Sequence, residues 1–239
     1  MNAHGELPAT GQAVLSFVGG GGCMRAVIIA FGHTEDGIDW QKWIQDGDWI
    51  LGADGGAARA LAWGLVPQVV IGDMDSLTDV DRTALRSRGC RFVEHPRAKD
   101  ETDLELALVY AVREGAQEIL VLGALGGRLD HTLANVLLLT LPSLEGVPVR
   151  IVNGDEEAML VRSGETVTVR GNPGDLVSLL PLRSDAHGVT TSGLAWALHG
   201  DALKFGFSRG VSNEMTDSVA RIKVDDGYVL VVHRSSPEG

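Results

Sequence analysis

Cysteine, long apolar runs and basic residues are all in short supply in this chain. Its 239 residues include two cysteines, Cys23 and Cys90, which form no Cys-x-x-Cys pair. This argues against a disulfide framework and against a zinc site, and it favours a reducing cytoplasm as the location. No apolar run approaches the roughly 18 to 20 residues needed to cross a bilayer, so we expect no membrane-spanning segment.

The shortage of basic residues bears on possible partners. The chain has 32 acidic and 20 basic residues, a formal net charge of -12. Such a field repels phosphate, which disfavours nucleic acid and anionic membranes as partners. A phosphorylated small substrate remains open if the chain supplies cations locally. The apolar fraction of 44% and the charged fraction of 22% are ordinary for a folded globular protein.

From Arg25 to about Val149, short apolar runs alternate with helical patterns. We expect strands at residues 25–32, 48–56, 67–73, 91–96, 117–123 and 149–155. We expect helices at residues 38–47, 56–65, 79–90 and 130–140, and one after a Thr-x-x-Glu capping box formed by Thr102 and Glu105. Val/Ile/Leu-rich strands that alternate with helices indicate a mainly parallel sheet covered on both faces.

The pattern changes after Gly154. Short strand-like runs, some with alternating polarity, are separated by Gly, Asn, Asp or Ser, and no long amphipathic helix interrupts them. They lie at residues 157–170, 174–182, 188–198, 202–210 and 220–233. This pattern is typical of an antiparallel β-sandwich or partial barrel. We therefore predict a flexible extension at 1–23, an α/β domain at 24–150 and an all-β domain at 151–239.

Polar residues follow several of the predicted parallel strands, at the point where each strand ends. Asp54 precedes Gly55 and Gly56, Asp73 and Asp75 follow the next strand, and two later segments carry further charged residues. Those segments contribute Lys99, Asp103, Arg128 and Asp130. Because parallel strands end along one edge of the sheet, where such folds bind ligands, we expect these groups to converge there.

Converging carboxylates suit Mg²⁺, which takes oxygen ligands and substrate phosphates. On an extended chain Asp73 and Asp75 would point to the same side and reach one metal. Glycines at 55, 56, 126 and 127 would let backbone N–H groups approach phosphate, and Arg97, Lys99 and Arg128 would offset its charge. A metal, cations and positioning are what phosphoryl or pyrophosphoryl transfer requires.

Simpler structural interpretations exist for single members of this set. Thr102 and Glu105 serve a helix cap, Asp103 would favour the helix dipole, and Asp130 would be an N-cap. His95 and His131 lack a second histidine or cysteine at ligand spacing, so they are read as polar residues at the edge of the site. Helix caps and turns explain single residues, but they do not explain why charged residues follow the ends of several strands that meet at one edge of the sheet.

Six segments of the sequence resemble those of a known family. "ADGGAARAL", "IGDMDSL", "KDETDLELAL" and "GGRLDHTLANVLLL" stand in the order found in thiamine pyrophosphokinases, and "TTSGLAWAL" and "RGVSNE" look like the thiamine-side motifs of that family. The resemblance covers residues 25 to 232. It implies Mg²⁺-dependent transfer of the pyrophosphoryl group of ATP to the hydroxyethyl group of thiamine, which gives thiamine diphosphate and AMP.

The resemblance also implies roles for residues. Its metal positions map onto Asp73, Asp75, Asp103 and Asp130. Its ATP-binding positions map onto Asp54, Gly55, Gly56, Lys99, Arg128, Asp130 and Asn135. The catalytic set is Asp73, Asp75, Asp103 and Arg128, with Asp75 or Asp103 as the first candidates for the general base. Trp196 would stack on thiamine, and Ser212 and Asn213 would hydrogen bond to it.

Further expectations come from the family. Its members are homodimers that hold thiamine between the α/β domain of one subunit and the β domain of the other. Many carry a lysine before the tryptophan, where this chain has Ala195. Without the family match, Trp196 would be read as a core or interface aromatic.

Three alternatives remain open. The first is a pyrophosphokinase for another hydroxymethyl heterocycle, such as a pterin. The second is a non-catalytic module that binds thiamine or a nucleotide. The third is a metal-dependent phosphatase, which would release inorganic phosphate and need no acceptor alcohol.

Overall fold

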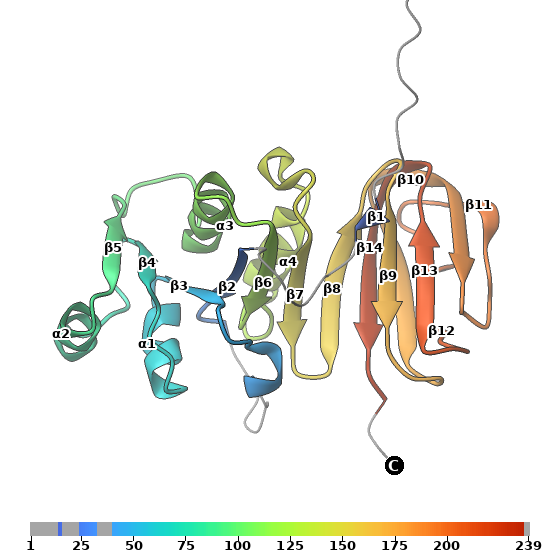
Figure 1. Ribbon diagram of the computed structural model, residues 1–239. Helices are drawn as coiled ribbons and strands as arrows, with labels where there is room; N and C mark the ends of the chain where they lie inside the picture. Colours follow the sequence, from blue (N-terminus) through green and yellow to red (C-terminus); the bar gives the residue numbers. More distant parts are fainter. Residues whose placement is uncertain (1–13, 16–23, 33–39, 237–239) are drawn as a thin grey trace, which may run out of the picture.

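The computed structural model describes residues 14–15, 24–32 and 40–236 (Figure 1). Most of the predicted extension at 1–23 and part of the predicted helix at 38–47 lie outside these residues. The described piece of the extension is β1 (Val14–Leu15), which pairs in parallel with β9 (Thr166–Arg170). At these two residues the chain therefore joins the sheet.

The first part of the chain is an α/β structure built on parallel strands. Their order across the sheet is β5-β4-β3-β2-β6-β7, and each neighbouring pair is parallel. The strands are β2 (Arg25–Ile29), β3 (Trp49–Ala53), β4 (Val69–Gly72), β5 (Arg91–Glu94), β6 (Glu118–Leu122) and β7 (Val149–Asn153). The predicted α/β class is confirmed for this part.

Helices connect these strands and lie on both faces of the sheet (Figure 1). They are α1 (Gly56–Ala62), α2 (Asp79–Ser87), α3 (Asp103–Arg113) and α4 (Leu129–Leu138), with short 3₁₀ turns η1 (Gln41–Trp43) and η2 (Pro142–Leu144). Alternate residues of β2 separate the layers: Ala26 and Ile28 pack in the core with α3, and Val27 and Ile29 pack in the core with α1. Burial on both faces explains the nearly continuous apolar strands.

Local signals fix the helix ends. Thr102 Oγ1 accepts a hydrogen bond from the N–H of Glu105 at 3.2 Å, which starts α3 as predicted. The capping box with bonds in both directions lies at α2, between Thr78 and Asp81. The helix expected at 38–47 is one 3₁₀ turn in its described portion.

The second part of the chain is antiparallel. Its elements are β8 (Glu156–Val161), β9, β10 (Leu176–Ser192), β11 (His199–Leu203), β12 (Asn213–Glu214), β13 (Val219–Lys223) and β14 (Asp226–Arg234). β8 pairs with β7, so hydrogen bonding continues from the parallel strands into the antiparallel ones. We call β2 to β7 with their helices the α/β part, and β8 to β14 the β part.

Strand β10 joins the two layers of the β part. Its first half pairs with β14 and its last residues pair with β13. Side chains of β8, β10 and β14 face those of β9 and β13 across a core that includes Met159, Val169 and Val231. The predicted antiparallel sandwich is confirmed. Two details differ: β10 is one long strand where two runs were expected, and residues 204–210 form turns.

Among the described residues, no helix combines the length and the apolar character that a bilayer crossing requires.

Candidate functional site

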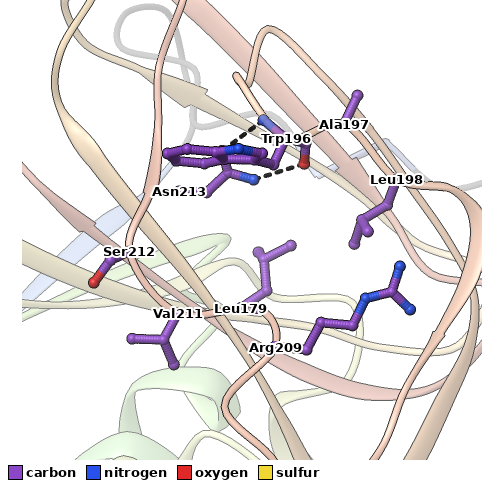
Figure 2. Close-up of a pocket in the computed structure, with 9 residues that line it drawn as sticks. Leu179, Trp196, Ala197, Leu198, Arg209, Val211, Ser212 and Asn213 are labelled. Atoms are coloured by element: carbon purple, nitrogen blue, oxygen red, sulfur yellow. Dashed lines mark hydrogen bonds between the residues drawn. The ribbon is translucent and has the colours of Figure 1, made fainter.

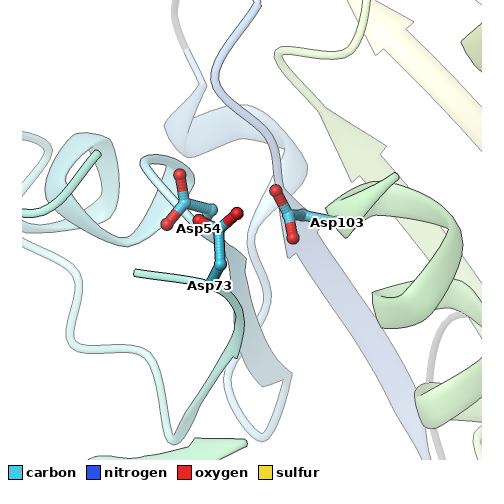
Figure 3. A group of neighbouring side chains, drawn as sticks. All are labelled: Asp54, Asp73 and Asp103. Carbon is cyan, nitrogen blue, oxygen red and sulfur yellow. The ribbon is translucent and has the colours of Figure 1, made fainter. Parts of the chain in front are cut away.

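Three carboxylates meet at the edge of the sheet where the parallel strands end. Asp54 follows β3, Asp73 follows β4, and Asp103 is the first residue of α3. One oxygen from each lies within 4.8 Å of the others (Figure 3). The expected convergence is therefore present for these residues, which we call the carboxylate cluster.

Backbone geometry at two positions allows this close approach. Asp54 is buried and adopts a positive φ of 42°, which is uncommon for a residue other than glycine. Gly72 has a φ of 147°, and a Cβ at this residue would stand 2.8 Å from Oδ1 of Asp103. A side chain at position 72 would therefore push into the cluster. Backbone of this kind gathers at functional sites in folded proteins.

Lys99 lies against the cluster. Its Nζ is 2.8 Å from Oδ1 of Asp103 and 3.7 Å from Oδ2 of Asp73. Burial alone would lower the pKa of Lys99, but its contact with Asp103 and the charges of Asp73 and Asp54 raise that pKa. Lys99 is therefore a stable cation that partly neutralises the cluster.

The pKa values of Asp103 and Asp73 are shifted in opposite directions. Burial raises the pKa of Asp103, and the contact with Lys99 offsets this only in part. The N–H of Asp75 donates a hydrogen bond to Asp73 at 3.1 Å and lowers the pKa of Asp73, and the charge of Lys99 adds to this. The surroundings of Asp73 thus favour its ionised form, whereas those of Asp103 disfavour it.

Asp75 lies outside the cluster. The residue before it, Met74, is buried and has a φ of 63°, so the chain turns between Asp73 and Asp75. Asp75 is exposed, and its carboxylate lies 3.3 Å from Nε of Arg97. The chain is therefore not extended here as expected, although a side-chain hydrogen bond with Asp75 still helps to lower the pKa of Asp73. The metal and catalytic roles given to Asp75 stay predictions.

A cavity of about 510 Å³ opens beside the carboxylate cluster. Its lining comes from the ends of β2, β3 and β6 and from α3 and α4, and includes Asp54, Gly55, Asp103, Asp130, His131 and Asn135. The cavity therefore gathers residues from the segments that the strand-end argument singled out. Its size suits part of a nucleotide.

Other predicted ATP-binding residues lie in or near this cavity. Asp130 is exposed and pairs with Arg128, whose Nη2 is 2.5 Å from its carboxylate. The Asn135 side chain donates to the carbonyl oxygen of Ala124 at 2.6 Å. Gly56 has a packing role, because a Cβ there would lie 1.8 Å from the carbonyl oxygen of Ile29.

The carboxylate cluster fits a hard divalent cation. Oδ1 of Asp54 is buried and has no hydrogen-bond partner among the described residues. Carboxylate oxygens are the donors that Mg²⁺ prefers. The sequence argument gave Asp54 to ATP rather than to the metal, although its position after β3 matches that of Asp73 after β4.

Two further cavity residues were not singled out as ligand contacts. Phe31 follows β2, is 59% exposed and lines the cavity, and the guanidinium of Arg59 lies 5.1 Å from its ring centre. His131 also lines the cavity. No charge pattern in the sequence marks Phe31. Its place after a parallel strand is the signal that could have found it.

A second cavity, of about 480 Å³, lies in the β part (Figure 2). All three residues expected at the thiamine side line it: Trp196, Ser212 and Asn213. The Trp196 ring is largely exposed, with 62% of the residue accessible. An exposed indole at a cavity offers a flat apolar and π-electron face to a ligand.

Hydrogen bonds hold Trp196 in place. Asn213 is buried, its Oδ1 accepts from the N–H of Trp196 at 3.0 Å, and its Nδ2 donates to the Trp196 carbonyl at 2.8 Å (Figure 2). Asn213 therefore positions the backbone that carries the indole. Ser212 has a φ of 59°, and its N–H donates to Oγ of Ser178 at 3.0 Å.

Comparisons with known proteins relate this chain to a protein family. Residues 40–151 match the pattern described as the thiamin pyrophosphokinase catalytic domain, and residues 165–229 match the thiamin pyrophosphokinase vitamin B1 binding domain. Together the two matches span most of the chain. The chain belongs to the thiamine pyrophosphokinase family. The carboxylate cluster falls in the first match and Trp196 in the second.

Individual family members agree with this assignment. The chain is 27% identical to thiamine pyrophosphokinase of Bacillus subtilis over 84% of its own length and 89% of that protein. It is 29% identical to thiamine pyrophosphokinase 1 of rice over 70% of its length and 66% of that protein. The crystal structure of thiamin pyrophosphokinase from Geobacillus thermodenitrificans superposes with a TM-score of 0.77 at 26% identity, covering 90% of this chain and 99% of that one.

The fold extends to distant family members. Yeast thiamin pyrophosphokinase superposes with a TM-score of 0.74 at 16% identity, over 90% of this chain and 87% of the yeast chain. At this identity the likeness concerns the fold.

Proposed function

We propose that this chain transfers the pyrophosphoryl group of ATP to the hydroxyethyl oxygen of thiamine, giving thiamine diphosphate and AMP. The observation that carries the proposal is the carboxylate cluster, Asp54, Asp73 and Asp103, beside a cavity of about 510 Å³ in a member of this family. The Trp196 cavity supplies the second binding site that such a transfer requires.

Mg²⁺ is the cation that this donor set suits best. Asp54, Asp73 and Asp103 would hold it. When bound, the ion offsets the negative charge of the ATP phosphates.

The charged side chains around the cluster have two further roles, charge stabilisation and proton transfer. Lys99 and Arg128 stabilise the negative charge that builds on the transferred group, which is an electrostatic contribution of the kind that dominates many enzymes. A carboxylate, Asp75 or Asp103, accepts the proton of the thiamine hydroxyl. The oxygen of that hydroxyl attacks the β-phosphorus of ATP, and AMP leaves.

The Trp196 cavity binds thiamine. Thiamine is aromatic and cationic, and an indole face attracts such a ring through dispersion and cation–π contact. Asn213 sets the position of the indole through its two bonds to the Trp196 backbone. In this scheme residues 24–150 bind ATP and the metal, and residues 151–239 bind thiamine and contribute to dimerisation.

We further propose a homodimer. The carboxylate cavity and the Trp196 cavity have no lining residue in common among the residues that the structure describes. One belongs to the α/β part and the other to the β part. Direct transfer requires the thiamine hydroxyl to touch the ATP phosphates. This contact is possible if the Trp196 cavity of one copy faces the carboxylate cavity of a second copy.

Exposed apolar residues near the two cavities support this arrangement. Helix α4 has no fully buried residue, and Leu129, Leu133 and Leu137 form an exposed stripe at helical spacing. Phe205 and Phe207 are exposed in the β part, in the segment that leads to the Trp196 cavity. Packing such surfaces against a second copy would remove them from water.

The experiment that tests the function is a turnover assay. The protein is mixed with ATP, Mg²⁺ and thiamine, and AMP and thiamine diphosphate are measured together. We expect the two products in equal amounts. Inorganic phosphate without an acceptor product would indicate a phosphatase, and AMP formed only with a pterin alcohol would indicate a different acceptor. Binding of thiamine and ATP without any product would indicate a non-catalytic module.

A cytoplasmic location stays a prediction based on the two cysteines, of which Cys90 is free and buried.

A further inference from the structure

The Trp196 cavity contains one charged side chain, and it is a cation. Among the described residues, its lining is Leu179, Trp196, Ala197, Leu198, Arg209, Gly210, Val211, Ser212 and Asn213. Figure 2 shows Arg209 on the opposite side of the cavity from the indole of Trp196. A cavity for a cationic heterocycle has no electrostatic use for a guanidinium alone, because like charges repel.

Two bonds hold Arg209 in this position. Its Nη2 donates to Oδ1 of Asp201 at 2.7 Å, and its Nη1 donates to the carbonyl oxygen of Ala202 at 3.4 Å. A guanidinium has five N–H donors, so Arg209 retains donors that can reach a ligand. The backbone N–H of His199 and the guanidinium of Arg209 lower the pKa of Asp201, so this tether is ionised at neutral pH.

A purely structural role explains the pair poorly. The side chain of Arg209 is 58% exposed and that of Asp201 is 31% exposed. Ion pairs with this much access to water contribute little to folding stability. The pair does, however, keep a planar guanidinium at the cavity, and guanidinium matches the oxygens of phosphate in a two-bond geometry.

We propose that Arg209 binds the diphosphate end of the ligand in the Trp196 cavity, so that the cavity favours thiamine diphosphate over thiamine. This inference rests on the function proposed above. Asp201 holds the guanidinium of Arg209 in position to bind the phosphates. While thiamine occupies the cavity, the negative charge of Asp201 offsets the repulsion between the guanidinium and the thiazolium ring. Arg209 is therefore a specificity residue that distinguishes the product from the substrate and slows product release.

The test measures binding in the absence of ATP. Thiamine and thiamine diphosphate are titrated separately into the wild-type chain, Arg209→Ala and Arg209→Lys, by calorimetry. Because a charge-assisted bond is lost, Arg209→Ala should weaken thiamine diphosphate binding about tenfold or more. Its thiamine affinity should change less than about threefold or increase, since a like charge has been removed. Arg209→Lys should retain part of the preference.

A matched control is Arg170→Ala, which removes another exposed arginine of the β part that does not line the Trp196 cavity. It should leave both affinities unchanged, and circular dichroism should show that all variants fold. Equal losses for the two ligands in Arg209→Ala, or no loss for either, would overturn the inference. The proposed function fails separately, if the wild-type chain makes no thiamine diphosphate from ATP and thiamine.

Discussion

Asp73 is a member of the carboxylate cluster whose surroundings favour the ionised form. Asp73→Asn keeps the shape of the side chain and removes its charge. We expect turnover to fall by about a hundredfold or more, as when one preorganised charge contact is lost from an active site. The fold should persist, because Asp73 follows β4 at the edge of the sheet and is not part of the apolar core. The measurement is AMP formation at saturating substrates together with a thermal melt.

Asp46→Asn is the matched control for this change, because Asp46 is an exposed aspartate in the loop before β3. It should keep wild-type turnover. Near-normal activity in Asp73→Asn would remove Asp73 from the metal site.

Trp196 offers a second test on a single side chain. Trp196→Ala should raise the KM for thiamine about tenfold and leave the KM for ATP nearly unchanged, because the indole lines the Trp196 cavity and not the cavity beside the carboxylate cluster. The exposed ring contributes little to the core, so the fold should be retained. Steady-state kinetics with each substrate varied in turn provides the readout. A similar rise in both constants would point to a packing role instead.

The residues of the carboxylate cluster show what the sequence could predict and where it could not. Asp73 and Asp103 were predicted because parallel strands end along one edge, and the same rule applied more strictly would have added Asp54. Asp75 was placed beside Asp73 on the assumption of an extended chain. The buried Met74 adopts a left-handed conformation there, and burial of a large apolar side chain outweighs its backbone strain. Sequence spacing does not reveal such a turn.

Helix α4 presents a test of the proposed interface. Leu133 and Leu137 are 55% and 53% exposed. The double change to serine should shift the molecular mass from that of a dimer to that of a monomer and abolish most turnover. The melting temperature at low protein concentration should change little, because these side chains are not in the core. Light scattering on the eluting protein measures the mass.

The control for the α4 variant is Val80→Ser, which removes an exposed apolar side chain of α2. It should keep the wild-type mass and activity. A wild-type chain that is monomeric and fully active would contradict the interface.

A buried ionic network ties together strands of both parts. His233 on β14 lies 2.9 Å from Glu157 of β8 and 3.0 Å from Asp175, through its two ring nitrogens. Arg150 of β7 lies 3.2 Å from Glu157 and 3.3 Å from Glu118 of β6. Burial alone would lower the pKa of His233, but the two carboxylates raise it above 6.5. The charged imidazole therefore belongs to the folded state.

This shift predicts how stability depends on pH. A group whose folded pKa is raised contributes stability fully below its unfolded pKa and loses it as pH rises through the folded pKa. The difference in unfolding free energy between the wild type and His233→Gln should therefore be largest below the ordinary pKa of histidine and shrink as the pH rises through the raised pKa of the folded state. Urea unfolding at several pH values measures it. A difference that grows with pH would show that His233 is buried in its neutral form.

The sequence identified most strands and helices of the α/β part because each has its own apolar pattern and boundary residues. It did less well in the β part. Strand β10 was expected as two runs, since Arg183, Ser184, Asp185 and His187 are polar and exposed where the strand passes between layers, and only Ala186 is buried among them. The apolar residues at 204–210 are exposed in turns, and Phe205 and Phe207 imitate a strand pattern. Surface apolar residues mislead any argument that equates them with a core.

The whole molecule combines a parallel and an antiparallel sheet in one hydrogen-bonded path, with β7 paired to β8 at the junction (Figure 1). The order β5-β4-β3-β2-β6-β7 depends on pairing between distant segments, which local patterns do not encode. The two classes of fold could be predicted, whereas the order of the strands could not. The crystal structure of the Geobacillus thermodenitrificans family member has the same architecture, with a TM-score of 0.77.

In the proposed homodimer, the carboxylate cluster of one copy and the Trp196 cavity of the other serve one transfer reaction. The most direct test purifies a heterodimer of Asp73→Asn and Trp196→Ala chains through two different affinity tags. One of its two sites is then intact, so we predict about half of the wild-type thiamine diphosphate formation under conditions where each variant alone is nearly inactive. A heterodimer no more active than its parents, or the absence of any heterodimer, would contradict the account.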